Sequence, residues 1–184
     1  MTDINRYLPI ENDRVRLRAL ADRDAEAYAA GTSDRAVRRF AHLPEPHYTP
    51  ELVRKLVHTV VRQGLRDGEL ALLTIAAADS DAFRGSLVLF DITEQEAEVG
   101  FWLAPQARGH GLAREAIGLA VRLAARLGLR RLRATAAMEN TASLRTLAGA
   151  GFTAVGEPDA RSAPSGARVV AQCYELLVEP AEAS

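Results

Sequence analysis

A glycine-rich turn at residues 106–111 has the composition of a phosphate-binding loop. It reads Gln-Ala-Arg-Gly-His-Gly and is followed at once by an apolar, alanine-rich segment. Glycines let the backbone turn tightly, and a helix start adds unpaired N–H donors at the positive end of the helix dipole. Together such groups bind a pyrophosphate, and the side chains of Arg108 and Arg114 can add positive charge. The alternative interpretation is an ordinary strand-to-helix turn.

Two other kinds of phosphate loop do not fit this sequence. A kinase-type loop requires Gly-Lys-Ser/Thr, and no such tripeptide follows Gly111. A dinucleotide-binding loop requires a third small residue where this chain has Arg114, and an acidic residue at the end of the next strand, where none lies near Arg133.

The elements on either side of the turn have clear patterns. Residues 97–103 alternate as a strand does, which puts Glu98, Gly100 and Trp102 on one face and the apolar side chains on the other. Residues 111–127 predict a long helix, whose arginines at i+4 spacing are most simply a solvated face. Taken alone, Glu98 reads as a solvated strand glutamate, and Trp102 as a cleft wall or core residue.

The remaining elements predict a mixed α/β or α+β layer fold without a second core. We expect Asp22 and Ser33 to cap the first two helices. Residues 158–166 are expected to form a loop between the last two strands. The other strands are expected at 14–18, 70–78, 86–92, 131–137, 152–155 and 169–178, and the other helices at 23–30, 33–40, 50–63 and 141–149.

Composition excludes several classes of function. The chain has 184 residues and a net charge of -1, which argues against a general nucleic-acid binder. A single cysteine, Cys173, excludes an internal disulfide and a cysteine-based zinc site. The longest nearly apolar run, 70–78, is too short to span a bilayer, and no signal peptide is visible, so we expect a cytoplasmic protein. The four histidines form no metal set, and no metal is expected; they are His42, His47, His58 and His110.

Two blocks of sequence resemble a known family. Residues 97–113, Ala-Glu-Val-Gly-Phe-Trp-Leu-Ala-Pro-Gln-Ala-Arg-Gly-His-Gly-Leu-Ala, resemble the GNAT superfamily of acetyl-CoA-dependent N-acetyltransferases. Within it they are most similar to the group of ribosomal-protein N-terminal alanine and serine acetyltransferases. The segment from Glu139 to Arg145, followed by Ala150-Gly151-Phe152, resembles the family's Asn-x-x-Ser segment and its Gly-Phe. The opening 16–20 also resembles the family's first strand, so the resemblance spans one domain at 14–178 with extensions at 1–13 and 179–184.

The resemblance implies a central mixed, mostly antiparallel sheet of six to seven strands, flanked by about four helices. This sheet is splayed between 97–103 and 131–137, where the pantetheine arm of acetyl-CoA pairs like an extra strand. The residues that the resemblance places beside acetyl-CoA are Phe101, Trp102 and Leu103 on the strand, Arg108, Gly109, His110, Gly111, Leu112 and Ala113 in the pyrophosphate loop, and Asn140, Ser143 and Arg145 on the later helix.

Acetyl transfer to an amine requires a neutral amine, a polarised thioester and reprotonation of the thiolate. An α-amino group has a pKa near 7.8, so its deprotonation at pH 7 costs only about 1 kcal/mol, and a weak or water-relayed base suffices. With the family in view, Glu98 is the candidate base. Many members carry a tyrosine as the acid where this chain has Leu147. Ser143 is the candidate in its place, with a cofactor contact or local hydroxyl as its alternative role, and Tyr174 is a more remote one.

The sequence therefore predicts an acetyl-CoA-dependent N-acetyltransferase that acts on a primary amine, either a protein N-terminus or a small molecule. One alternative acceptor is an antibiotic, polyamine or other metabolite amine. The other alternative is a CoA-binding module that does not catalyse, which the missing tyrosine suggests. Residues 42–50 and 159–166 are the loops that can shape an acceptor site. No membrane or nucleic-acid partner is expected, and both a monomer and a homodimer stay open.

Overall fold

An open sheet organises the chain, and its strand order is β1-β2-β3-β4-β5-β6-β8-β7 in the described residues. The computed structural model describes residues 2–41, 43–162 and 168–180. The strands are β1 (Ile10–Glu11), β2 (Val15–Ala19), β3 (Ala71–Ala77), β4 (Phe83–Phe90), β5 (Glu96–Leu103), β6 (Arg131–Ala137), β7 (Thr153–Ser162) and β8 (Arg168–Leu177). All neighbouring pairs are antiparallel except β5 and β6, which confirms the mixed, mostly antiparallel sheet.

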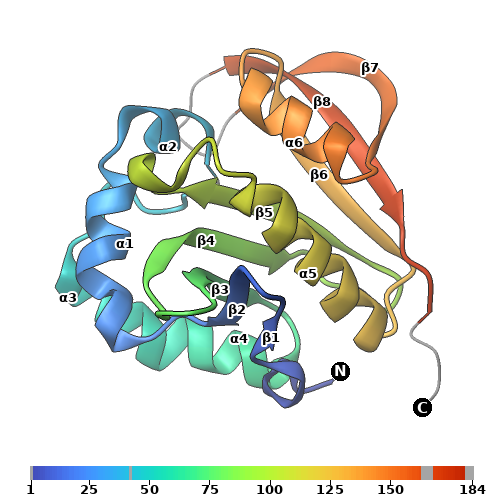
Figure 1. Cartoon of the computed structure of the whole chain (residues 1–184). Coiled ribbons are helices and arrows are strands. Elements are labelled where there is room, and N and C mark those ends of the chain that lie inside the picture. The colour runs from blue at the N-terminus through green and yellow to red at the C-terminus, as the bar shows by residue number, and fades with distance from the viewer. Residues whose placement is uncertain (1, 42, 163–167, 181–184) are drawn as a thin grey trace.

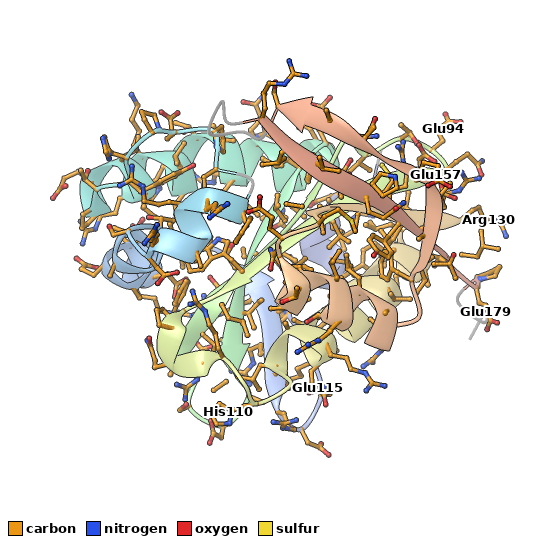
Figure 2. The ribbon with its side chains drawn as sticks, turned by 90° about the horizontal axis from the view of Figure 1, so that it is seen from above. Glu94, His110, Glu115, Arg130, Glu157 and Glu179 are labelled. Atoms are coloured by element: carbon orange, nitrogen blue, oxygen red, sulfur yellow. The ribbon has the colours of Figure 1, made fainter. Side chains whose placement is uncertain are left out.

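Helices cover both faces of the sheet (Figure 1). Helices α5 (Leu112–Arg126) and α6 (Thr141–Gly149) lie on one face, and α3 (Pro50–Leu56) and α4 (Arg62–Asp67) lie on the other, as both views show (Figures 1 and 2). A π-helical segment, η3 (Val57–Val61), joins α3 to α4. The remaining helical elements are η1 (Ile4–Tyr7), η2 (Asp22–Asp24), α1 (Ala25–Thr32), α2 (Arg35–Phe40) and η4 (Pro105–Ala107).

The sheet splays between β5 and β6, as the resemblance implies. The two strands pair in parallel only from Glu96 and Arg131 to Glu98 and Arg133. Beyond these positions the strands separate, and β6 continues its pairing with β8 through Ala137. Over residues 99–103, the edge of β5 that faces β6 therefore has no neighbouring strand from the described part of the chain.

Several predicted boundaries are wrong, and each error has a local cause. The loop expected at 158–166 is strand through Ser162, because a register shift between Val155 and Asp159 lets β7 pass Pro158 without requiring its missing N–H. Residues 163–166 of that expected loop lie outside the described residues. The helix expected to end at 63 continues to Asp67 through the π-helical segment and stops at Gly68, whose φ is 73°.

Two helix caps also differ from those expected. Asp34, not Ser33, caps α2, and its carboxylate accepts the N–H groups of Ala36 and Val37 at 3.1 Å. Asp22 lies inside η2, while the carboxylate of Asp24 accepts the Ala21 N–H at 3.0 Å. The sequence analysis also missed β1, so the sheet has eight strands in the described part of the chain rather than six or seven.

The core reaches the site through a cluster of aromatic rings. The Trp102 ring centroid lies 5.3 Å from that of Tyr28 and 5.8 Å from that of Phe83. A Cβ atom on Gly31 of α1 would approach the Trp102 ring to 2.4 Å, so only glycine permits this packing. The cluster anchors the end of β5 against α1 and fixes the wall of the site described next.

Candidate active site

A cavity of about 980 Å³ opens where β5 and β6 separate. Its walls come from α2, β5, the turn before α5, the start of α6 and the ends of β6, β7 and β8. The sequence-predicted residues that it brings together are Glu98, Phe101, Trp102, Leu103, Arg108, Gly109, Gly111, Leu112, Ala113, Asn140 and Ser143. A volume of this size accommodates a cosubstrate arm together with an acceptor.

The turn before α5 presents a row of amide N–H groups. Gly109 and Gly111 adopt φ values of 80° and 76°, in the left-handed region that favours glycine. None of the N–H groups of residues 109–114 donates to another residue in the described part of the chain. The first turn of α5 adds its dipole to these donors, so an anion is bound favourably here.

Two residues of the predicted loop behave differently from the expectation. The Arg108 N–H already donates to the Pro105 carbonyl at 3.3 Å, so the free donors begin at Gly109. The His110 side chain is exposed and lines a smaller hollow outside the cavity, together with Arg14 and Arg84. Figure 2 shows His110 projecting from the edge of the molecule, on the same side as Glu115. Arg14 supports the loop from this side, because its guanidinium donates to the His110 carbonyl at 2.7 Å.

The Arg108 guanidinium ties the loop to α2 and to β5. It donates to the Asp34 carboxylate at 2.6 Å and to the Leu103 carbonyl at 3.2 Å. The hydrogen bond from Arg108 is the main reason that the pKa of Asp34 is lowered. Because Asp34 also caps α2, this one ion pair sets where α2 lies against the cavity.

The start of α6 contributes two polar side chains to the opposite wall. Asn140 caps the helix, and its side-chain oxygen accepts the Ser143 N–H at 3.2 Å. The Asn140 amide nitrogen and the Ser143 hydroxyl make no hydrogen bond to any described residue, so both are free to contact a ligand. Arg145 is exposed and does not line the cavity.

The position of the family's tyrosine carries a buried apolar side chain. Leu147 is 1% exposed and lines the cavity, so it supplies no hydroxyl. Tyr174 is half-buried in β8 and is not among the lining residues. Ser143 and Thr146 are the hydroxyl groups that α6 does place on the cavity.

Glu98 lies at the point where the two strands part. It is the last residue of β5 that pairs with β6, and its register partner there is Arg133. Its carboxylate forms no hydrogen bond or ion pair with the described residues, although it lines the cavity. The group is therefore free to accept a proton from a bound molecule.

The sequence analysis missed one wall of the cavity. This wall consists of Ala36, Val37, Arg39, Phe40, Ala41 and Pro44 on or after α2, with Phe90 from β4 and Arg161, Ser162, Val169 and Ala171 from β7 and β8. The contribution of the loop 42–50 and of the segment after Asp159 had been expected only in general terms. Asp34 and Arg108 are 74 positions apart, and no local pattern indicates that they pair.

Comparisons with known proteins settle the family. The family model described as acetyltransferase (GNAT) domain matches residues 14–153. The chain belongs to the GNAT acetyltransferase family. No curated protein matches the sequence.

Solved structures of other acetyltransferases share the fold. A GNAT-family acetyltransferase from Bacillus anthracis superposes with a TM-score of 0.74 at 24% identity, over 92% of this chain and 98% of that one. RimJ of Mycobacterium smegmatis, in complex with CoA-disulfide, superposes with a TM-score of 0.74 at 22% identity, over 89% of this chain and 81% of that one. Spermidine N-acetyltransferase from Vibrio cholerae, in complex with CoA and spermine, superposes with a TM-score of 0.76 at 20% identity, over 91% of this chain and 97% of that one.

The described residues contain no group of three His, Cys, Asp or Glu side chains that could hold a metal ion. None of the described helices is long and apolar enough to cross a bilayer.

Proposed function

We propose that this acetyltransferase moves an acetyl group from acetyl-CoA to a primary amine by direct attack on the thioester. The observation that carries the proposal is the coincidence of two open hydrogen-bonding edges on one cavity. One is the row of free N–H groups at 109–114, and the other is the unpaired edge of β5 over residues 99–103.

The two edges suit the two ends of acetyl-CoA. The N–H groups from Gly109 onward bind the pyrophosphate, because they combine free donors with the helix dipole. The edge of β5 offers backbone groups to the pantetheine arm, in the manner of an added strand. The amide of Asn140 and the hydroxyl of Ser143 face the arm from the other wall.

The chain's own groups account for the proton movements. As the amine nitrogen attacks the carbonyl carbon, the C–N bond forms, and a proton passes to Glu98 directly or through water. A β5 backbone N–H stabilises the oxyanion that develops. When the C–S bond breaks, the thiolate takes a proton from water, directly or through the Ser143 hydroxyl, since Leu147 has none to give. The Glu98 carboxyl then returns its proton to the water, which restores the balance.

One experiment separates catalysis from binding alone. Calorimetry with acetyl-CoA measures the affinity, and a thiol-release assay over a panel of primary amines measures turnover. We expect micromolar binding and turnover of at least one amine. Binding without any turnover would favour the second candidate, a CoA-binding module, for which Leu147 at the tyrosine position is the supporting observation. No affinity for acetyl-CoA would contradict both.

The solved neighbours include RimJ and a spermidine N-acetyltransferase, and a fold shared at 20–22% identity does not choose between such acceptors. Protein N-termini and small-molecule amines, including antibiotics and polyamines, are therefore all included in the panel.

A further inference from the structure

On the cavity wall, positively charged side chains outnumber negatively charged ones. In the part of the chain that the structure describes, the cavity is lined by four arginines and one carboxylate: Arg39, Arg108, Arg114, Arg161 and Glu98. Arg108 and Arg114 flank the pyrophosphate loop. Arg39 and Arg161 belong to α2 and β7, outside the loop and outside β5. Residues 163–167, which the structure does not describe, read Ala-Pro-Ser-Gly-Ala and hold no carboxylate.

A chain of contacts places Arg39 and Arg161 at the same end of the cavity. Arg39 pairs with Glu139, which follows Met138 directly. The Met138 N–H donates to the Val170 carbonyl at 2.8 Å. Val170 and Val169 are the register partners of Ala160 and Arg161. The two arginines thus border one region, next to the start of α6.

Both guanidinium groups keep unused donors. Arg39 engages Glu139 through one terminal nitrogen and lies 5.2 Å from the centroid of the Phe40 ring. Arg161 engages Asp159 through Nε at 2.6 Å and also hydrogen-bonds the Cys173 side chain. A guanidinium has five N–H donors, so each retains several that can bind a further anion. Glu139 and Asp159 do not line the cavity, and both are exposed, which makes these pairs easy to exchange.

We propose that the acceptor is a primary amine that also carries an anionic group, either a carboxylate or a phosphate. This inference rests on the proposed function. The anion binds to Arg161 and Arg39, because a planar guanidinium can donate two parallel hydrogen bonds to a carboxylate or to a phosphate. The amine of the same molecule reaches Glu98. A polyamine would instead place its remaining cations against two arginines, and like charges in a partly enclosed site disfavour binding.

The test uses amines that differ only in the anion. O-phosphoethanolamine is compared with ethanolamine, and a short peptide Ser-Asp-Ala-Ala amide with Ser-Asn-Ala-Ala amide; spermidine is the cationic probe. We expect kcat/KM to be about tenfold higher for the anionic member of one pair, which identifies the source of the anion, and the preference to shrink as salt rises. Spermidine is expected to be the poorest substrate.

Variants that remove a positive charge are compared with variants that remove a negative charge, to distinguish anion binding from a structural role of the arginines. R161Q and R39Q should each abolish most of the preference by raising the acceptor KM, with the acetyl-CoA affinity unchanged. D159N and E139Q release the same guanidinium groups from their present partners, so they should increase the preference. If the ion pairs only stabilised the fold, all four substitutions would act in the same direction. R126Q, at an exposed position of α5 away from the cavity, is the control.

Each result decides one point. Turnover with no preference in either pair, or with spermidine as the best substrate, overturns the inference and leaves the proposed function intact. A rise in the acetyl-CoA dissociation constant for R161Q and R39Q, without a change in the acceptor KM, also overturns it, because the arginines then serve the cosubstrate. Absence of turnover with every amine rejects the proposed function and the inference together.

Discussion

Glu98 pairs with Arg133 in register, and beyond it β5 and β6 diverge around the cavity. This position places a carboxylate that makes no hydrogen bond with the described residues at the closed end of the opening between the strands. The nitrogen of the neutral amine becomes positively charged as the C–N bond forms and must then lose a proton, and a carboxylate at this end can take it. The Trp102 side chain, on the same face of β5, also lines the cavity.

We therefore expect Glu98→Gln to lower kcat about 100-fold near pH 7, which is typical of the loss of a general base. The affinity for acetyl-CoA should not change. The residual rate should rise with pH, because a larger fraction of the amine is then neutral. Thiol release measured across pH tests this, with Glu94→Gln, in the exposed turn before β5, as the matched control (Figure 2). Full activity at every pH would remove Glu98 from the mechanism.

Asp24 is a buried carboxylate that holds the first helices to the sheet. Arg18 donates to both of its oxygens, at 2.6 and 2.9 Å, and Thr74 donates to one of them at 2.9 Å. Burial alone raises the pKa of Asp24, but the bonds from Arg18 and the Ala21 N–H outweigh it, and the net pKa is lowered. A lowered folded-state pKa stabilises the protein above the unfolded-state pKa, and this contribution is lost as pH falls through the folded-state pKa.

Asp24→Asn should reduce the free energy of unfolding by about 2 kcal/mol at neutral pH, because Arg18 loses its charged hydrogen bonds to Asp24 and keeps only its ion pair with Asp81, at 2.8 Å. The difference in the free energy of unfolding between the variant and the wild type should narrow below about pH 4, because protonation of Asp24 removes the same stabilisation from the wild type. Urea unfolding at neutral and acidic pH measures both. Asp22→Asn, whose exposed carboxylate pairs with His58, should change stability by less than about 0.5 kcal/mol. A stability difference that stays constant with pH would contradict a stabilising role for the ionised Asp24 carboxylate.

At the scale of elements, substitutions at two glycines distinguish the effect of backbone strain from the effect on ligand binding. Gly109 in the loop and Gly128 after α5 both have a φ of 80°, and a Cβ atom at either would meet nothing within 4 Å. Gly109→Ala and Gly128→Ala should each cost about 1–2 kcal/mol of stability, because an L-residue is strained at this φ. Only Gly109→Ala should also weaken acetyl-CoA binding, by about tenfold, since its methyl group lies beside the pyrophosphate donors. Equal affinities in the two variants would show that the loop is an ordinary turn.

The elements of this chain differ in how far local sequence predicts them. The alternation of residues 97–103 and 131–137 predicts β5 and β6, and the Asn140–Ser143 spacing predicts the α6 start, because these patterns are local. The caps of the first two helices are predicted at the wrong residues. Two acceptors lie close together in sequence at each helix start, and distant contacts distinguish them: Arg18 pairs with Asp24, and Arg108 pairs with Asp34. The α2 wall was missed because it reaches the cavity through tertiary contacts alone, and Arg161 was expected only as part of the loop 159–166.

At the scale of the whole molecule, the cavity divides one sheet into two halves. Strands β1 to β5 form one half, and β6, β8 and β7 form the other; three register pairs between β5 and β6 join them within the sheet. Contacts of α5 with β2, β5 and β6 cross the same boundary. A ligand that pairs with the β5 edge and also contacts α6 adds links between the halves.

Acetyl-CoA should therefore stabilise the protein and slow its amide hydrogen exchange at the boundary. At about 100 times the dissociation constant, the ligand adds about 2.7 kcal/mol, which raises Tm by roughly 5–10 °C for a chain of this length. Exchange should slow most at residues 99–103, 109–114 and 140–143, and least at β1 to β3. Gly128→Ala should retain this pattern from its lower starting stability, and Gly109→Ala should lose protection at 109–114 first. Protection spread evenly over the sheet, or confined to β1 to β3, would place the ligand elsewhere.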